Sequence, residues 1–205
     1  MISGMSTAPT KAITYLGQLL LREHFRIGRF VAGHTGIITP GGKVVEAVSS
    51  GARERDLRES DWSEEHAYLR LPEDYAGQHL DAAAIARAMI GIPYSIASYA
   101  YLGSYIAGCE SDYLLRHIDR RQDPISIHVP APRIHTLIDI RLPVEAICSV
   151  LCDQAWTLTG KKVVDKTKPQ VVTPGMLTRQ LWTRPGVQRG GPGLSGYNGL
   201  DTLAQ

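Results

Sequence analysis

Three residues far apart in the chain have the side-chain types that thiol chemistry needs: Cys148, His34 and Glu46. A cysteine attacks a carbonyl group as a thiolate, so it needs a nearby base and surroundings that favour the charged sulfur. An imidazole can be that base, and a carboxylate can fix the tautomer and orientation of the imidazole. These residues are therefore the candidate catalytic set.

The segment around Cys148 is predicted to be the start of a helix. Pro143 disfavours helical geometry in the residue before it, so a new element begins after it. Apolar residues then recur at the spacing of one helix face: Leu151, Cys152, Ala155 and Leu158. Gly160 predicts the end of the helix. The N-terminus of a helix carries unpaired N–H groups and a partial positive charge, which favour a thiolate and can hold an oxyanion.

The alternative for each cysteine is a place in the core, because free cysteines are among the most buried residue types. Cys152 is expected to pack behind Cys148 in this way, and Cys109 is expected to be inert. Three cysteines at irregular spacing are also too few for a disulfide framework.

His34 and Glu46 lie on a predicted β-hairpin. Two runs rich in β-branched residues, 31–39 and 43–48, flank the turn sequence Pro40-Gly41-Gly42. Antiparallel pairing would bring the start of the first strand, with His34, close to the end of the second, with Glu46. The alternative for His34 is a strand histidine with a satisfied hydrogen bond. The alternative for Glu46 is a charge on an edge strand that discourages aggregation.

The remaining chain is predicted to mix strands and helices. Four segments have the pattern of regular elements: a strand at 68–72 and helices at 16–25, 77–90 and 98–108. Gly91 and Pro93 end the helix before them. A further helix is expected after Thr173 as N-cap, with Pro174 at its first position. Residues 117–135 contain three X-Pro pairs and are predicted to be irregular.

The length of 205 residues and the composition indicate one domain with appended ends. We expect a disordered N-terminus at 1–10, a catalytic domain at 11–183 and a Gly/Pro-rich tail at 184–205, which can dock to a larger assembly. The net charge of +2 predicts no nucleic-acid partner. The N-terminus lacks a signal-peptide pattern, and no apolar run approaches the ~20 residues that span a bilayer. We therefore expect a protein made in the cytoplasm without stable membrane insertion, with delivery to the cell wall or carriage in a virion left open.

The motifs and their order resemble a known family. The motifs are His34-Thr35-Gly36-Ile37, Val44-Val45-Glu46-Ala47, Gly91-Ile92-Pro93-Tyr94, Cys148-Ser149 and Val172-Thr173-Pro174-Gly175. This order resembles the circularly permuted branch of the NlpC-type cysteine hydrolases, the YiiX-like group, in which the histidine strand precedes the cysteine helix. The resemblance covers about residues 30 to 180.

The resemblance implies an α+β fold that is papain-like and circularly permuted, with an antiparallel sheet packed against helices and the nucleophile at a helix N-terminus. It implies that Cys148 is the nucleophile, His34 its base and Glu46 the orienting residue. Tyr94 and Ser149 would lie in the substrate-binding part of the site. No cofactor and no metal are expected, because the histidines outside this set, His117, His128 and His135 among them, lack the spacing of metal ligands.

Three functions stay open from the sequence. The first is hydrolysis of an amide or peptide bond through an acyl-enzyme, with cell-wall peptides as the substrate class that the resemblance implies. The second is a lipid hydrolase or acyltransferase that forms a thioester, with an aromatic run as an acyl groove: Tyr94, Tyr99, Tyr101 and Tyr105. The third is a catalytically silent structural component, such as a part of a phage virion.

Overall fold

Among the described residues, seven strands come before the first helix, and both helices and strands follow it. The structure, a computed structural model, describes residues 4–8, 26–27, 30–31, 33–57, 67–98, 100–101, 125–131, 136–142, 145–164 and 172–191. Their elements are β1 (Gly4–Ala8), β2 (Arg26–Ile27), β3 (Phe30–Val31), β4 (His34–Thr39), β5 (Lys43–Val48), β6 (Gly51–Asp56), β7 (Ala67–Arg70), the 3₁₀ helix η1 (Glu73–Gln78), α2 (His79–Ala88), β8 (Ile125–Ala131), β9 (Thr136–Leu142), α5 (Cys148–Thr157), α6 (Pro174–Thr183) and β10 (Gln188–Gly190).

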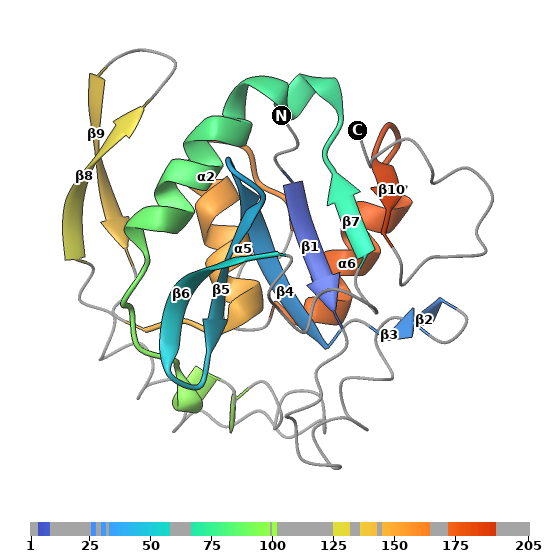
Figure 1. Cartoon of the computed structure of the whole chain (residues 1–205), viewed down its shortest axis with the longest axis horizontal. Helices are drawn as coiled ribbons and strands as arrows, with labels where there is room; N and C mark the ends of the chain where they lie inside the picture. Colours follow the sequence, from blue (N-terminus) through green and yellow to red (C-terminus); the bar gives the residue numbers. More distant parts are fainter. Residues whose placement is uncertain are drawn as a thin grey trace.

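One antiparallel sheet organises the described residues. Its strand order is β10-β7-β1-β4-β5-β6, and each neighbouring pair is antiparallel (Figure 1). Two further strand pairs, β2–β3 and β8–β9, lie outside this sheet. The predicted α+β class with an antiparallel sheet is therefore confirmed.

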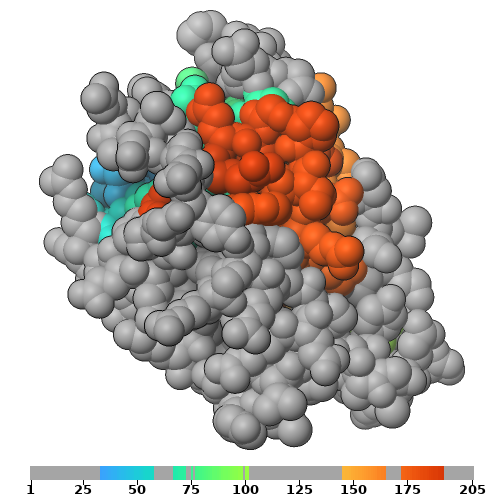
Figure 2. All heavy atoms as spheres, turned by 90° about the vertical axis from the view of Figure 1, so that its right-hand side faces the viewer, coloured from blue at the N-terminus to red at the C-terminus, as the bar shows by residue number. Residues whose placement is uncertain are grey.

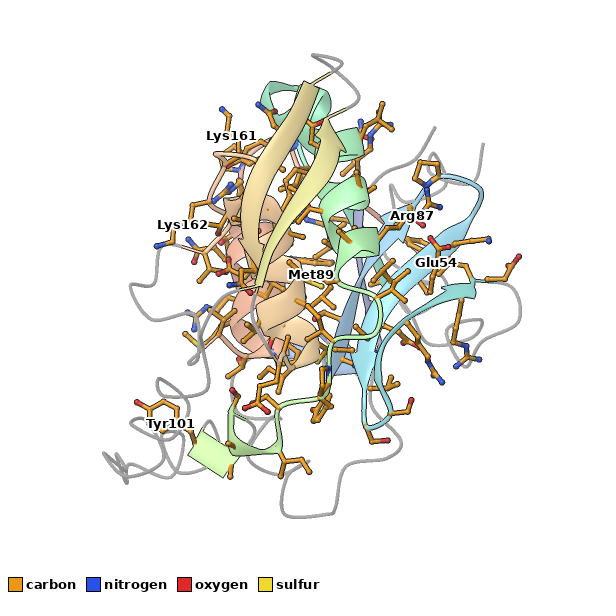
Figure 3. All side chains as sticks on the ribbon, turned by 90° about the vertical axis from the view of Figure 1, so that its left-hand side faces the viewer. Glu54, Arg87, Met89, Tyr101, Lys161 and Lys162 are labelled. Atoms are coloured by element: carbon orange, nitrogen blue, oxygen red, sulfur yellow. The ribbon has the colours of Figure 1, made fainter. Side chains whose placement is uncertain are left out.

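The helices α2, α5 and α6 lie on one face of this sheet (Figures 1 and 3). Ile37 and Val45 are paired in register and face α2 and α5, so they join Ile85, Met89 and Leu151 in one buried cluster. All five side chains are at most 2% exposed. Burial of such apolar surface is the main source of stability here, at about 25 cal/mol for each Å² removed from water.

The predicted β4–β5 hairpin is present, and glycines permit its turn. Gly41 and Gly42 have φ values of 90° and 71°, a region that side chains disfavour. Gly51 opens β6 with a φ of 106°, and a Cβ there would lie 3.0 Å from the carbonyl oxygen of Ile92. Glycine therefore lets the end of the α2 region approach β6, where Ala52 N–H donates to Ile92 O across 2.8 Å.

The predicted starts of α5 and α6 agree with the structure, whereas α2 (His79–Ala88) is shorter than the predicted helix at 77–90 and ends with Met89 as its C-cap. Gly91 follows α2 with a φ of 90°, and Gly160 follows α5 with a φ of 82°. The helix α6 begins at Pro174, and its N-cap Thr173 accepts a hydrogen bond from Met176 N–H across 2.8 Å. In Figure 2 the orange-red colour of residues 172–191 covers a large area of the surface on this side of the molecule.

Three predicted irregular regions contain strands instead. Residues 4–8 form β1 between β7 and β4, residues 188–190 of the expected tail form β10, and residues 125–131 form β8 of a hairpin with β9. Backbone hydrogen bonds to neighbouring strands stabilise such segments, and local composition does not show these partners. Pro130 has no backbone N–H group to donate. It fits in β8 because both strands of a two-stranded sheet are edge strands, where some N–H positions face away from the partner strand.

Several predicted features lie outside the described residues. They are the helix at 16–25, most of the helix at 98–108, Cys109, His117 and His135.

Candidate active site

The hairpin of β4 and β5 brings His34 and Glu46 into contact. Gly36 pairs with Glu46, and His34 lies two residues before Gly36 on the same face of the strand. The Nε2–H of His34 donates a hydrogen bond to Oε2 of Glu46 across 2.9 Å. The structure thus brings these two residues together as the hairpin pattern predicts.

The other oxygen of Glu46 is held by arginine. Nε and Nη2 of Arg53 each lie 3.0 Å from Oε1, and Nη1 of Arg55 lies 3.8 Å from the same oxygen. The Glu46 side chain is 3% exposed, so its charge is almost removed from water. A buried carboxylate of this kind is stable only when cations and hydrogen-bond donors face it.

Cys148 is the first residue of α5 and is hydrogen-bonded to His34. Burial raises the pKa of the Cys148 thiol, but the positive charge of His34 and hydrogen bonds from His34 and Thr35 offset this and lower the pKa below its ordinary value. The whole residue is 6% exposed. The sulfur is therefore sheltered and favours the thiolate form.

The imidazole of His34 shows the complementary shift. Burial lowers the pKa of His34, but the charge of Cys148 and hydrogen bonds to Cys148 and Glu46 raise the pKa to about 10. Since Nε2 donates to Glu46, Nδ1 is left to exchange a proton with Cys148. A lowered thiol pKa beside a raised imidazole pKa favours a thiolate–imidazolium pair.

The N-terminus of α5 has no capping side chain. The N-cap residue is Ile147, which is extended with a φ of −96° and a ψ of 165°. The first intrahelical hydrogen bond runs from Leu151 N–H to Ile147 O, across 2.9 Å. The N–H groups of Cys148, Ser149 and Val150 therefore belong to the uncapped end of the helix. This end of the helix supplies positive partial charge for a thiolate and donors for an oxyanion.

Thr35 was not among the residues expected in the site. Its backbone N–H and its hydroxyl group both help to lower the pKa of Cys148, and the hydroxyl opposes the rise in the pKa of Cys152. The side chain is buried, and its hydroxyl makes no hydrogen bond of normal geometry among the described residues. No sequence pattern marks this role, because the contact depends on how α5 packs against β4.

The backbone of Tyr94 lies next to the start of α5. Tyr94 forms a parallel β-bridge with Ala146, which is two residues before Cys148. Ser95 N–H donates to Ala146 O across 3.1 Å, and Ala146 N–H donates to Pro93 O across 3.0 Å. The backbone of the Gly91–Tyr94 motif therefore lies next to the segment that leads into the Cys148-Ser149 motif.

A buried polar cluster holds this junction. The hydroxyl oxygen of Ser95 lies 2.6 Å from that of Ser98 and 3.0 Å from Oε1 of Glu145. Ser98 N–H donates to the same Ser95 hydroxyl across 3.0 Å. These bonds fix the backbone that leads into Cys148, which keeps the thiol in one position.

Ser149 has a different role from the predicted one. Its side chain is fully buried, and its hydroxyl donates to the carbonyl oxygen of Val172 across 2.6 Å. The hydroxyl thus ties α5 to the residues that precede α6 and is not directed to a ligand. Only the backbone N–H of Ser149 belongs to the end of the helix where an oxyanion would bind.

Arg53 and Arg55 were also not anticipated as neighbours of the site, although the sequence contains a signal for Arg53. Val48 pairs with Gly51 across a two-residue turn. Two residues further from the turn along each antiparallel strand, Glu46 lies opposite Arg53. The mixed charges of residues 53–61 instead favour a solvated edge. The strand β6 does form the edge of the sheet.

No metal site is indicated where the structure gives side-chain positions. Among the described residues, no three histidine, cysteine, aspartate or glutamate side chains form a group that could hold a metal ion. The side chains of His117, His128 and His135 lie outside this description.

Comparisons with known proteins give no relative: no family model, curated protein or solved structure matches the chain. None of the helices among the described residues is long and apolar enough to cross a membrane. A functional argument for this chain therefore depends on the chemistry of the site.

Proposed function

We propose that this protein is a cysteine hydrolase that cleaves an amide or peptide bond. The observation that carries the proposal is the connected set Cys148, His34 and Glu46, in which sulfur and imidazole both favour their charged forms. A cysteine kept only for packing needs neither an imidazolium partner nor an uncapped helix N-terminus.

The proposed reaction has two steps. The thiolate of Cys148 attacks the carbonyl carbon, and N–H groups at the start of α5 stabilise the oxyanion. His34 then gives its Nδ1 proton to the leaving amine, the C–N bond breaks, and a thioester remains on Cys148. Water loses a proton to His34 and attacks the thioester, which releases the acid and restores the thiolate–imidazolium pair.

The architecture supports assignment to a papain-like, circularly permuted fold. The sheet is antiparallel, helices cover one face, and the histidine strand β4 precedes the cysteine helix α5 in the chain. The resemblance to permuted NlpC-type hydrolases rests on the same segments, and it makes cell-wall peptides the leading substrate class of this proposal.

An acyl hydrolase or acyltransferase is the second candidate, and one exposed residue favours it. Ile96 is 76% exposed, and the residue before it, Ser95, is hydrogen-bonded to Ala146, two residues before the start of α5. The expected aromatic groove gains no support from Tyr101, which is 1% exposed and belongs to the interior. The side chains of Tyr99 and Tyr105 lie outside the described residues.

Two matched cysteine variants test the proposal. The wild-type protein, Cys148→Ala and Cys152→Ala are assayed on peptidoglycan fragments with intact stem peptides and on short-chain p-nitrophenyl esters. We expect hydrolysis by the wild type and by Cys152→Ala, and a loss of about 10³-fold or more in Cys148→Ala. Mass spectrometry of the wild type with an ester should find the acyl group on Cys148.

The outcomes separate the candidate functions. Cleavage of the peptide substrate supports the amidase, and acylation by esters without peptide cleavage supports the acyl hydrolase. If neither substrate reacts and Cys148 is alkylated no faster than an ordinary thiol, both enzymatic functions are wrong and a structural role remains.

A further inference from the structure

Beyond the three proposed catalytic residues, the cross-strand partner of Glu46 has the geometry of a fourth member of the site. Glu46 and Arg53 are directly paired in the β5–β6 register, so their side chains share one face of the sheet. The two carboxylate oxygens are divided between two partners. Oε2 accepts from His34 at 2.9 Å, and Oε1 accepts from Arg53 Nε at 3.0 Å, with Nη2 at the same distance.

The charges around Glu46 explain why a second cation is needed. Among the interactions of the described residues, the charged groups that face it are His34 on β4 and Arg53 and Arg55 on β6. In the proposed reaction His34 loses its proton to the leaving group and is neutral in the thioester stage. At that stage these two arginines keep their positive charge beside the buried carboxylate, and Arg53 is the one of the two within hydrogen-bond distance, since Arg55 is 3.8 Å away.

We propose that Arg53 is a positioning residue, which keeps Glu46 ionised and oriented so that Glu46 holds His34 against Cys148 throughout the reaction. This inference rests on the proposed function, because it assigns Arg53 a part in the same site. Arg53 acts through Glu46 and does not contact the sulfur. The Arg53 side chain is 42% exposed, but the Glu46 carboxylate that it holds is only 3% exposed, so the pair acts on a buried charge.

A second arginine–glutamate pair, between a helix and the same sheet, serves as a control. Arg87 on α2 reaches Glu54 on β6, with Nε 2.6 Å from Oε1, and Figure 3 shows the two side chains meeting. Glu54 follows Arg53 in the strand and therefore faces the opposite side of the sheet from Glu46. Loss of Arg87 removes an ion pair of similar geometry without touching His34 or Glu46.

The test measures alkylation of Cys148 by iodoacetamide as a function of pH, followed by peptide mass spectrometry. In Arg53→Gln, Glu46 loses a cation that favours its charged form, so it takes up a proton at a higher pH than in the wild type. Once neutral, Glu46 no longer stabilises the imidazolium. The acidic inflection of the alkylation profile should therefore move up by about half a unit to one unit, with Arg53→Lys restoring most of the shift.

The controls distinguish this inference from the proposed function. Arg87→Gln should leave the inflection unchanged, and Arg53→Gln should add nothing when Glu46→Gln is already present. An unmoved inflection in folded Arg53→Gln, or in Arg53→Met if the glutamine variant does not fold, overturns the role of Arg53 while the reactive thiol remains. A wild-type Cys148 that reacts as an ordinary thiol overturns the proposed function itself.

Discussion

Cys148 and Cys152 lie on successive turns of the same face of α5, yet the structure gives them opposite charge preferences. The two residues are 6% and 0% exposed, and burial raises the pKa of both thiols. For Cys148, the imidazolium of His34 more than offsets burial and the pKa falls. For Cys152, the remaining charges add to burial, and the pKa rises well above its ordinary value. One contact with a histidine thus separates a reactive thiol from a packing residue.

Burial also raises the pKa of a carboxyl group on the second turn of the helix. Asp153 follows Cys152 and is 3% exposed. Burial raises its pKa to about 6, although a hydrogen bond from Val164 N–H and the charge of Lys162 oppose the shift. The second turn of α5 therefore disfavours negative charge on either side-chain type, whereas the first turn favours it.

The strongest test of this contrast removes the imidazole. At about pH 6 an ordinary thiol is less than 1% thiolate, whereas the lowered pKa of Cys148 beside His34 favours the thiolate. In His34→Ala we expect iodoacetamide alkylation of Cys148 at that pH to fall by about 100-fold, towards the rate of Cys152. Quantitative peptide mass spectrometry of both cysteines in the same sample measures the difference directly.

Cys152 is the internal control for that measurement, because its alkylation reports any general loosening of the helix. A rise in Cys152 labelling would mean that His34→Ala has lost packing, and the measurement is then repeated with His34→Gln. The contrast between the two turns would be wrong if Cys148 in a folded variant without His34 still reacted at the wild-type rate.

Replacement of Asp153 by asparagine tests the second turn. The pKa of this carboxyl is raised from 3.8 in the unfolded chain to about 6 in the folded protein, so between these values the folded state binds more protons than the unfolded state. The free energy of unfolding therefore loses this contribution as pH rises from about 4 to about 6. Asp153→Asn does not titrate, so its free energy of unfolding relative to the wild type should increase by roughly 3 kcal/mol between about pH 3 and pH 8.

Urea unfolding of both proteins at several pH values measures that difference. The asparagine oxygen can still accept from Val164 N–H, which bonds to Oδ1 of Asp153 across 3.3 Å, so the variant preserves this contact. Asp56→Asn, at the end of β6, serves as a control for loss of one formal charge. A constant difference between Asp153→Asn and wild type at all pH values would contradict the raised pKa.

The local features of the site could be predicted from the sequence. The turn at Pro40-Gly41-Gly42 and the β-branched runs beside it determine the β4–β5 register, and this register brings His34 to Glu46. Helical periodicity and Gly160 likewise bound α5, so that Cys148 is its first residue. Both predictions rest on contacts between residues that are close in the chain.

The contact between His34 and Cys148 has another origin. It depends on how α5 packs against β4, and neither segment contains information about the other's orientation. The resemblance to a family supplied this pairing in the sequence analysis, whereas Thr35 and Arg53 had no such support. The strands β1 and β10 were missed for a related reason, because each is stabilised by partners distant in the chain.

The finest test of the two cysteines changes the hydroxyl group that they share. Thr35→Val replaces this hydroxyl by a methyl group of similar size, which removes the polar group that helps to lower the pKa of Cys148 but leaves the backbone N–H of residue 35 in place. The pKa of Cys148 should rise by less than about one unit, which lowers its alkylation at about pH 6 by at most tenfold. Thr35→Ser keeps the hydroxyl and should behave as wild type.

Because the hydroxyl also faces Cys152, whose thiol is neutral and fully buried, its removal should leave Cys152 unreactive. Equal alkylation profiles for the valine and serine variants would mean that His34 and the helix N-terminus alone account for the difference between the two thiols.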